Sequence, residues 1–296
     1  AVVGAGPAGM FAARELARNG VKVVIFNRDI KPGGLAEYGI YPDKQAMKQG
    51  LRTQFYQALQ TPGLTYFGNI TIGAQGDLSL DDLRALGFQA ILVTAGAQGT
   101  KWLSLPGEHL KGVYHAKGLV YHYNQLPPYS SDEFQFGKRA AVVGAGNVML
   151  DISRYLIQKI KVDEVIAVVR RGPAEVKFDR KEMEYVIANL DQRALDEEIA
   201  RVAPTMQSIG QDAEAAKAVI LEALPKAQST SSLTRFRFEF LVSPIQILSD
   251  ENEKVTGLEV EDNTLTMKDG EAKARGTGNK RVIPVNSVVF AIGDTV

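Results

Sequence analysis

The sequence of 296 residues contains no cysteine. Without thiolates, these residues can form no redox-active Cys-x-x-C pair, no cysteine-ligated iron–sulfur cluster and no zinc–thiolate site. The chain has only three histidines, His109, His115 and His122. Because these are too few for a rich metal centre, we predict no metal site. Redox chemistry by the chain's own cysteine sulfurs is thereby excluded.

An excess of one charge and long apolar runs are also missing. Lys+Arg and Asp+Glu both number 34, so bulk charge gives no support for a nucleic-acid partner. No run of 18 apolar residues occurs, which predicts no transmembrane segment. No signal peptide is visible, but the chain begins inside a strand pattern, so we expect further residues upstream of Ala1. The location predicted on this basis is the cytoplasm.

The first nine residues carry the pattern Gly-x-Gly-x-x-Gly directly after a short apolar run. Gly4 permits a tight turn out of the strand, Gly6 has no Cβ to keep the backbone from a pyrophosphate, and Gly9 lets a helix pack closely on the sheet. The sequence predicts that helix over residues 10–19 and a second strand over 21–26. This complete βαβ unit favours a dinucleotide site over an ordinary glycine turn.

The same fingerprint returns at Gly144, Ala145, Gly146, Asn147 and Val148, after an apolar run at 140–143. The following strand, predicted over 165–169, ends in Arg170 and Arg171 instead of an acidic residue. Two guanidinium groups at the ribose end of the strand supply the charge and the bidentate donors that a 2′-phosphate requires. The pattern therefore favours NADP over NAD, with a solvated basic turn as the alternative.

Polar and glycine-rich positions near the first fingerprint supply further candidates. Asn27 follows the second strand, where a ribose-binding fold usually has an acid, and Asp29 could replace it or simply be a solvated turn carboxylate. The loop with Gly34, Leu35 and Tyr38 either passes close to the cofactor or is a surface turn. A strand over 90–97, expected to be buried, ends in Ala95 and Gly96, where a backbone could approach a ligand.

The remaining patterns predict helices over 44–60, 80–86, 114–123, 181–203 and 212–224, strands over 64–72, 236–240, 242–248, 255–260 and 285–294, and a Gly/Lys turn region over 270–280. Pro106 and Gly107 lie in a link that we take as a domain boundary. The predicted domains are residues 1–102 and 103–284, with 285–296 as a strand that returns to the first domain. The final strand ends in Gly293 and Asp294.

Taken in order, these motifs resemble the adrenodoxin-reductase-type ferredoxin–NADP reductases, within the superfamily that includes the glutamate synthase small subunit. The resemblance rests on Gly4–Gly9, Gly34-Leu35, Tyr38-Gly39-Ile40, Ala95-Gly96-Ala97, Leu105-Pro106-Gly107, Gly144–Asp151, Arg170–Pro173, Phe238–Pro244 and Ala291–Asp294. It covers nearly the whole chain. It implies an α/β fold of two Rossmann-like dinucleotide-binding domains, with the NADP domain inserted into the FAD domain.

The resemblance also assigns cofactor contacts by position. Those expected for FAD are Gly4, Gly6, Pro7, Ala8, Gly9, Asn27, Gly34, Leu35, Tyr38, Ile72, Ala95 and Gly96. Those expected for NADP are Gly144, Ala145, Gly146, Asn147, Val148, Arg170, Arg171 and Glu182, and Gly293 and Asp294 complete the cofactor set. Glu182 could orient the nicotinamide amide, and Asp43 and Lys44 could tune protonation at the flavin. For each of these three, the alternative is an ordinary charge on a helix surface or at a loop tip.

Several positions depart from the family pattern. Asn27 replaces the acid at the FAD ribose, Lys44 stands where several members have a histidine near the flavin, and Met149 is larger than the usual alanine. The family's later flavin-contacting segment, with its Gly-Trp and Gly-Pro-x-Gly-x-Ile-Gly-Thr stretches, does not occur before Val296. We therefore expect the flavin site to be completed by residues outside this sequence.

The function that follows is an FAD-dependent oxidoreductase that moves electrons between NADP(H) and a ferredoxin-like iron–sulfur protein by hydride transfer to flavin. An acidic ferredoxin would need a basic surface, for which the candidates are Lys177, Arg180, Lys181, Arg235 and Arg237. The alternatives are an electron-input subunit of a larger complex, a nucleotide-binding scaffold without flavin, and a flavin monooxygenase.

Overall fold

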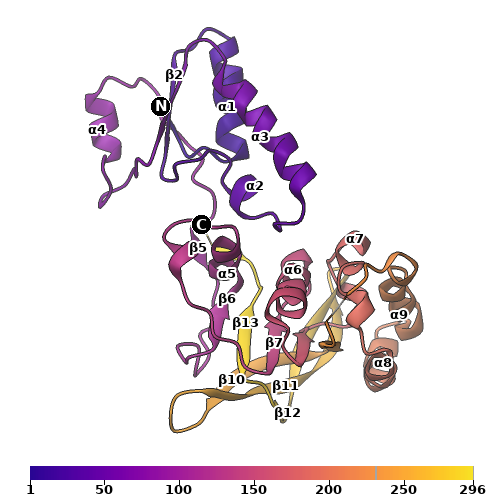
Figure 1. The fold of residues 1–296 in the computed structure, drawn as a ribbon. Helices are drawn as coiled ribbons and strands as arrows, with labels where there is room; N and C mark the ends of the chain where they lie inside the picture. Colours follow the sequence, from indigo (N-terminus) through magenta and orange to yellow (C-terminus); the bar gives the residue numbers. More distant parts are fainter. Residues whose placement is uncertain (231, 296) are drawn as a thin grey trace. The chain divides into compact units, whose positions relative to one another are not determined.

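The computed structural model describes residues 1–230 and 232–295, which form two compact units (Figure 1). The first unit consists of Ala1–Gly99, Val120–Asp132 and the end of the chain from Asp294. The second consists of Thr100–Leu119 and Glu133–Gly293. The segment from Val120 to Asp132 was predicted to lie in the second domain, whereas it packs within the first unit.

A four-stranded parallel sheet, in the order β3-β2-β1-β4, forms the centre of the first unit. Its strands are β1 (Val2–Val3), β2 (Val23–Asn27), β3 (Leu64–Gly68) and β4 (Leu92–Val93). Helices α1 (Pro7–Arg18) and α3 (Gln45–Leu59) pack against each other beside the sheet, and their apolar faces close a core around Met10, Ile25 and Phe55 (Figure 1). The predicted βαβ unit is thus present.

Shorter elements complete the first unit. They are α2 (Leu35–Tyr38), α4 (Leu80–Ala85) and the 3₁₀ turn η1 (Tyr129–Ser131). Strands β5 (Gly99–Thr100) and β14 (Asp294–Thr295) form a separate two-stranded sheet. Strand β4 is an exception to the expected burial. On β4, the edge strand of its sheet, Leu92 is 39% exposed and Val93 58%.

A five-stranded parallel sheet, in the order β6-β13-β7-β8-β9, forms the centre of the second unit. Its strands are β6 (Val113–His115), β13 (Ser287–Phe290), β7 (Arg139–Val143), β8 (Glu164–Val168) and β9 (Arg235–Glu239). Two predictions are corrected here. Residues 114 and 115, expected to be helical, belong to β6 before α5 (Ala116–Tyr123). Strand β13 pairs with β6 and β7, so the segment predicted to return to the first unit joins that unit only from Asp294.

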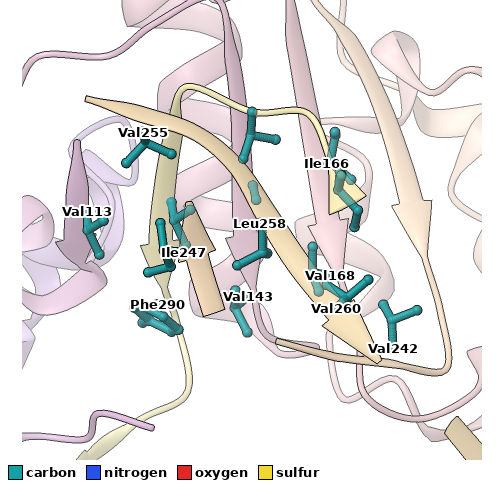
Figure 2. Packing of buried hydrophobic residues seen from close by; sticks show 14 of the residues in the cluster. Val113, Val143, Ile166, Val168, Val242, Ile247, Val255, Leu258, Val260 and Phe290 are labelled. Carbon is teal, nitrogen blue, oxygen red and sulfur yellow. The ribbon is translucent and has the colours of Figure 1, made fainter. Parts of the chain in front are cut away.

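Three antiparallel strands accompany this sheet: β10 (Val242–Ser249), β11 (Val255–Lys268) and β12 (Glu271–Ile283). Side chains of the antiparallel strands, among them Leu258 and Val260, pack with Val143 and Ile166 of the parallel sheet in one buried cluster (Figure 2). The region 270–280 was predicted as a turn and is instead most of β12, which continues from a tight turn at Asp269 and Gly270, both at positive φ.

The helices of the second unit are shorter than predicted. Helix α6 (Asn147–Tyr155) continues into a π turn, η2 (Leu156–Ile160), and further single turns are η3 (Pro173–Glu175) and η5 (Leu224–Lys226). The helix expected over 181–203 is divided into α7 (Arg180–Met183), η4 (Ile187–Asn189) and α8 (Gln192–Gln207), followed by α9 (Ala213–Leu221). The division occurs because the Asp191 carboxylate caps α8 at the Ala194 N–H, while the Asp191 N–H donates to the Phe236 carbonyl.

Candidate functional site

The first unit contains a cavity of about 400 Å³ at the carboxyl ends of β1 and β2. Of the residues predicted to bind FAD, all but Gly9 line it: Gly4, Gly6, Pro7, Ala8, Asn27, Gly34, Leu35, Tyr38, Ile72, Ala95 and Gly96. Sequence reasoning missed Thr94, Tyr121 and Leu126, which also line it. The last two come from the Val120–Asp132 segment, and no local motif marks them.

The three glycines of the first fingerprint have different surroundings. A Cβ on Gly4, which has φ +100°, would lie 2.6 Å from the Thr94 carbonyl oxygen, and one on Gly9 would lie 2.0 Å from the Gly4 carbonyl oxygen. A Cβ on Gly6 would meet nothing within 4 Å. Gly4 and Gly9 are therefore required by packing, whereas Gly6 leaves open space at the N-terminus of α1. This is the arrangement that a pyrophosphate requires.

The side chain of Asn27 is committed to the protein. Its Oδ1 accepts the Ala5 N–H at 2.9 Å, and its Nδ2 donates to the carbonyls of Asp29 and Lys31 and to the Tyr66 hydroxyl. Asn27 is 7% exposed. Its neighbour Asp29 also lines the cavity and carries a carboxylate, which pairs with the Arg28 guanidinium at 3.0 Å. Asp29 is thus the carboxylate at the end of β2 that borders the cavity.

A set of buried polar groups fixes α2 against the cavity. The Gly33 N–H donates to the Ala5 carbonyl at 2.7 Å, and the Asn124 amide donates to the Tyr38 carbonyl at 2.8 Å. Glu37 accepts two hydrogen bonds from Arg52, at 2.6 and 2.7 Å, which hold the pKa of this carboxyl below its usual range. Burial raises the pKa of Tyr38 to about 12, so its hydroxyl stays neutral.

A second cavity, of about 530 Å³, lies in the second unit at the carboxyl ends of β7 and β8. Five residues predicted to bind NADP line it: Gly144, Ala145, Gly146, Arg170 and Arg171. A Cβ on Gly144 would lie 2.5 Å from the Ala291 carbonyl oxygen, while one on Gly146 would meet nothing within 4 Å. The second fingerprint therefore repeats the first, with one glycine required by packing and one facing open space.

The second cavity is more basic than the sequence predicted. Lys101 and Lys177 line it together with the two arginines, and Glu175 is the one carboxylate among its lining residues. Lys177 is held against the glycine turn, since its N–H donates to the Ala145 carbonyl at 2.8 Å. Its backbone also bridges to Gly146. Proximity of this kind across 32 residues of chain has no local sequence signal.

Other predicted site residues lie outside the linings of these two cavities. Asn147 exchanges two hydrogen bonds with Asp179, at 2.7 and 2.8 Å, and Val148 is 47% exposed at the start of α6. The three candidates for chemistry, Asp43 and Lys44 in the first unit and Glu182 in the second, line neither cavity. The same holds for Gly293 and Asp294. Their roles remain predictions.

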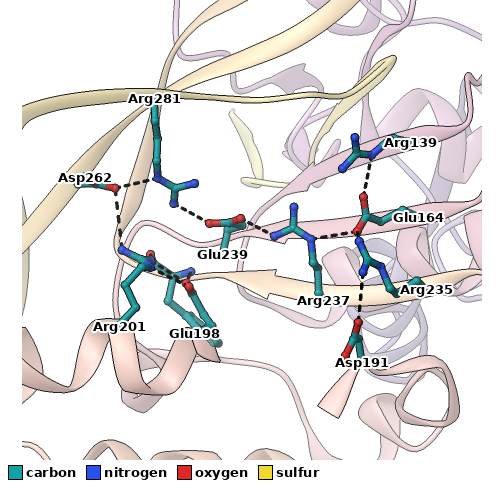
Figure 3. Close-up of polar contacts among 11 residues, drawn as sticks. Arg139, Glu164, Asp191, Glu198, Arg201, Arg235, Arg237, Glu239, Asp262 and Arg281 are labelled. Carbon is teal, nitrogen blue, oxygen red and sulfur yellow. Dashed lines mark hydrogen bonds and ion pairs between the residues drawn. The ribbon is translucent and has the colours of Figure 1, made fainter. Parts of the chain in front are cut away.

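The predicted basic surface for a ferredoxin is partly wrong. Arg237 is only 16% exposed in its side chain and pairs with Glu164 and Glu239, and Arg235 pairs with Glu164 and Asp191 (Figure 3). These arginines are neutralised by carboxylates of the sheet and of the neighbouring helix region. The Nε of Arg180 lies 3.8 Å from the Oε1 of Glu184. Among the predicted cations, Lys177 borders the second cavity and Lys181 is exposed.

Within residues 1–230 and 232–295, no group of three or more His, Asp or Glu side chains could hold a metal ion. No helix that the structure describes combines the length and apolarity required to cross a membrane.

Comparison with known proteins identifies relatives along the whole chain. The family model described as "Pyridine nucleotide-disulphide oxidoreductase" matches residues 1–296. The mitochondrial NADPH:adrenodoxin oxidoreductase of Arabidopsis thaliana is 30% identical over 99% of this chain and 66% of its own length. The NADPH-ferredoxin reductase FprA of Mycobacterium leprae is 28% identical over 99% of this chain and 70% of its own. The chain spans somewhat less than two thirds of the length of several adrenodoxin reductases that it matches, between 60% and 66%.

The fold also agrees with solved structures. Mycobacterium tuberculosis FprA in complex with NADPH superimposes with a TM-score of 0.80 at 26% identity, over 99% of this chain and 70% of that one. A second structure of the same protein gives a TM-score of 0.81. The α/β architecture with two dinucleotide-binding sheets, predicted from the two fingerprints, is confirmed by these structures and by the two parallel sheets.

Proposed function

We propose that this chain, which belongs to the pyridine nucleotide-disulphide oxidoreductase family, acts as a reductase that uses FAD to carry electrons from NADPH to a ferredoxin-type iron–sulfur protein. The observation that carries the proposal is the pair of glycine turns that face open cavities, of which the second is bordered by two adjacent arginines. The relatives named NADPH:adrenodoxin oxidoreductase and NADPH-ferredoxin reductase support the same reaction.

The first unit is assigned to FAD. The open space before Gly6 lies at the N-terminus of α1, where backbone N–H groups favour a pyrophosphate. Asp29, which borders the cavity, takes the place of the ribose-binding acid in this proposal. When bound, FAD would supply the conversion between a two-electron hydride and single electrons. The residues of this chain bind and orient it.

The second unit is assigned to NADPH. Gly146 opens α6 toward the cavity, and Arg170 and Arg171 follow β8 on the side where the ribose of a dinucleotide lies. Lys101 and Lys177 add two further positive charges to the cavity wall. A 2′-phosphate gains charge-assisted hydrogen bonds from such a group, whereas the hydroxyl of NADH does not.

Binding of two small nucleotides tests the assignment without enzyme turnover. We expect 2′,5′-ADP to bind the purified protein more tightly than 5′-AMP, by isothermal titration calorimetry. Arg170→Ala and Arg171→Ala should each weaken 2′,5′-ADP binding by about 10- to 100-fold, the loss expected for a charge-assisted hydrogen bond, and leave 5′-AMP binding nearly unchanged. The matched control is Arg193→Ala, an arginine of α8 that is exposed and lies outside the cavity lining. Equal affinities in the wild type would contradict the NADP assignment.

The protein partner and the role of the charged residues are tested separately. Anaerobic addition of NADPH should bleach the flavin bands and reduce a ferredoxin-type protein, and NADH should do so only at far higher concentration. The rate of flavin reduction tests the proposed roles at the nicotinamide and flavin, in the variants Glu182→Gln, Asp43→Asn and Lys44→Gln.

A stable complex with another subunit on purification would favour the alternative function, an electron-input subunit of a larger complex. A cytoplasmic location rests on the sequence alone, and cell fractionation tests it.

A further inference from the structure

The loop that carries Arg170 and Arg171 is held through its carbonyl groups. The N–H of Val242 donates to the Val169 carbonyl at 3.2 Å, and the N–H of Leu241 donates to the Arg171 carbonyl at 3.1 Å. Between them, the carbonyl of Arg170 accepts a hydrogen bond of 2.9 Å from the Nδ2 of Asn263. Three consecutive carbonyls are therefore fixed, and Asn263 is the one side chain among these donors.

Asn263 is built into the antiparallel sheet in a way that leaves its side chain little freedom. It lies on β11 at an irregularity of the β11–β12 pairing and is only 5% exposed. Its backbone N–H donates to the Leu241 carbonyl at 2.7 Å. Its side chain also exchanges hydrogen bonds with the Ser243 hydroxyl, at 2.9 and 3.2 Å, and Ser243 lines the same cavity as the arginines.

We infer that Asn263 is a positioning residue for recognition of the 2′-phosphate, and this inference rests on the NADP assignment proposed above. A buried amide that donates to the Arg170 carbonyl fixes the backbone from which the guanidinium extends. An arginine side chain is long and flexible. A fixed backbone therefore reduces the conformational entropy that is lost when the guanidinium binds a phosphate. Asn263 itself would not touch the nucleotide.

The test compares binding of 2′,5′-ADP and 5′-AMP to the wild type, Asn263→Asp and Asn263→Ala. Aspartate keeps the shape of the side chain but presents oxygen, which cannot donate, to the Arg170 carbonyl, and it also adds a negative charge. Asn263→Ala removes the donor without adding charge, so a loss shared by both variants reports on the missing hydrogen bond. We expect each variant to bind 2′,5′-ADP about tenfold more weakly while its affinity for 5′-AMP stays within about twofold. The matched control, Asn279→Ala, removes an exposed asparagine from β12 of the same sheet and should change neither affinity.

Thermal unfolding identifies variants that fail to fold, and if Asn263→Asp unfolds, Asn263→Ala decides the question. A merely structural role would weaken both nucleotides alike, which would overturn the inference. An unchanged preference for 2′,5′-ADP in folded variants would overturn it as well, while leaving the NADP assignment intact. A wild type without that preference would instead overturn the NADP assignment, and Arg170→Ala reports on that assignment independently.

Discussion

In the first Gly-x-Gly-x-x-Gly motif, Gly9 is required for packing and Gly6 is assigned to binding, and single substitutions can separate these two roles. A Cβ on Gly9 would lie 2.0 Å from a backbone oxygen, so we expect Gly9→Ala to displace α1 and to lower the thermal unfolding midpoint by several degrees. Gly6 has φ −69° and open space before it, so Gly6→Ala should fold as the wild type does. Its new methyl group would occupy the space assigned to the pyrophosphate.

The measurement is FAD content by absorbance, together with the unfolding midpoint of the protein without FAD. Gly6→Ala should lose FAD at an unchanged midpoint, whereas Gly9→Ala should lose both. The control is Gly20→Asn, at a position outside the cavity. A Cβ on Gly20 would meet nothing within 4 Å, and asparagine tolerates its backbone φ of +83°. Full FAD binding by Gly6→Ala would show that the pyrophosphate lies elsewhere.

Single residues also show what the sequence could and could not predict. The glycines were predictable because the backbone conformation and close approach they allow are local properties. Asn27 was expected to replace a ribose-binding acid, yet its amide holds Ala5, Asp29 and Lys31 in place. Lys177 was assigned to a protein-binding surface and instead borders the second cavity. Both outcomes depend on contacts between segments that the sequence does not place together.

At the level of elements, the strands of the second unit are joined by ion pairs. Glu164 on β8 accepts hydrogen bonds from Arg139 of β7, at 2.8 Å, and from Arg235 and Arg237 of β9, and its side chain is 5% exposed (Figure 3). Burial by itself raises the pKa of Glu164, but the hydrogen bond from Arg139 and the charge of Arg237 outweigh it, so the pKa is lowered.

We expect Glu164→Gln to lower the free energy of unfolding by about 3 kcal/mol at pH 7, because it removes the buried carboxylate that Arg139, Arg235 and Arg237 share. Arg235 keeps its pair with Asp191, and Arg237 keeps its pair with Glu239. A carboxyl whose pKa is lowered by folding stabilises the protein above its unfolded pKa of about 4.3, and this contribution is lost as the pH falls. The difference between wild type and variant should therefore shrink below about pH 4. Denaturant titrations at several pH values measure it.

The exposed pair Arg193–Glu197 on α8 provides the control. Glu197→Gln should cost less than about 0.5 kcal/mol at any of these pH values. If Glu164→Gln lowered the free energy of unfolding by as little as Glu197→Gln, the ion pairs of Glu164 would contribute no more to stability than surface pairs do.

Helices and strands could be predicted from the sequence where the pattern is local. The predictions failed where tertiary contacts determine the secondary structure. The two βαβ units followed from apolar runs next to glycine turns. The helical pattern of 181–203 did not reveal that Asp191 would bond to Phe236 and cap α8. The glycines and lysines of 270–280 are typical of a turn, but pairing with β11 along its length makes this segment a strand.

At the level of the whole molecule, each cavity is lined by residues of one unit only. The first lies within Ala1–Gly99 and Val120–Asp132, and the second within Thr100–Leu119 and Glu133–Gly293. Each unit also has a buried cluster of its own, around Met10 and Ile25 in the first and around Leu258 and Phe290 in the second. Each unit therefore has its own hydrophobic core, which can unfold separately, and its own cavity, through which a ligand can stabilise it.

We accordingly expect two transitions in differential scanning calorimetry, each sensitive to one ligand. A ligand present at about 100 times its dissociation constant stabilises its unit by about 2.7 kcal/mol, which corresponds to about 5–10 °C for units of this size. FAD should raise one midpoint and 2′,5′-ADP the other. Glu164→Gln, which lies in the second unit, should lower only the transition that 2′,5′-ADP raises. A single transition shifted alike by both ligands would mean that the two units unfold as one, because a ligand then stabilises residues far outside the unit that binds it.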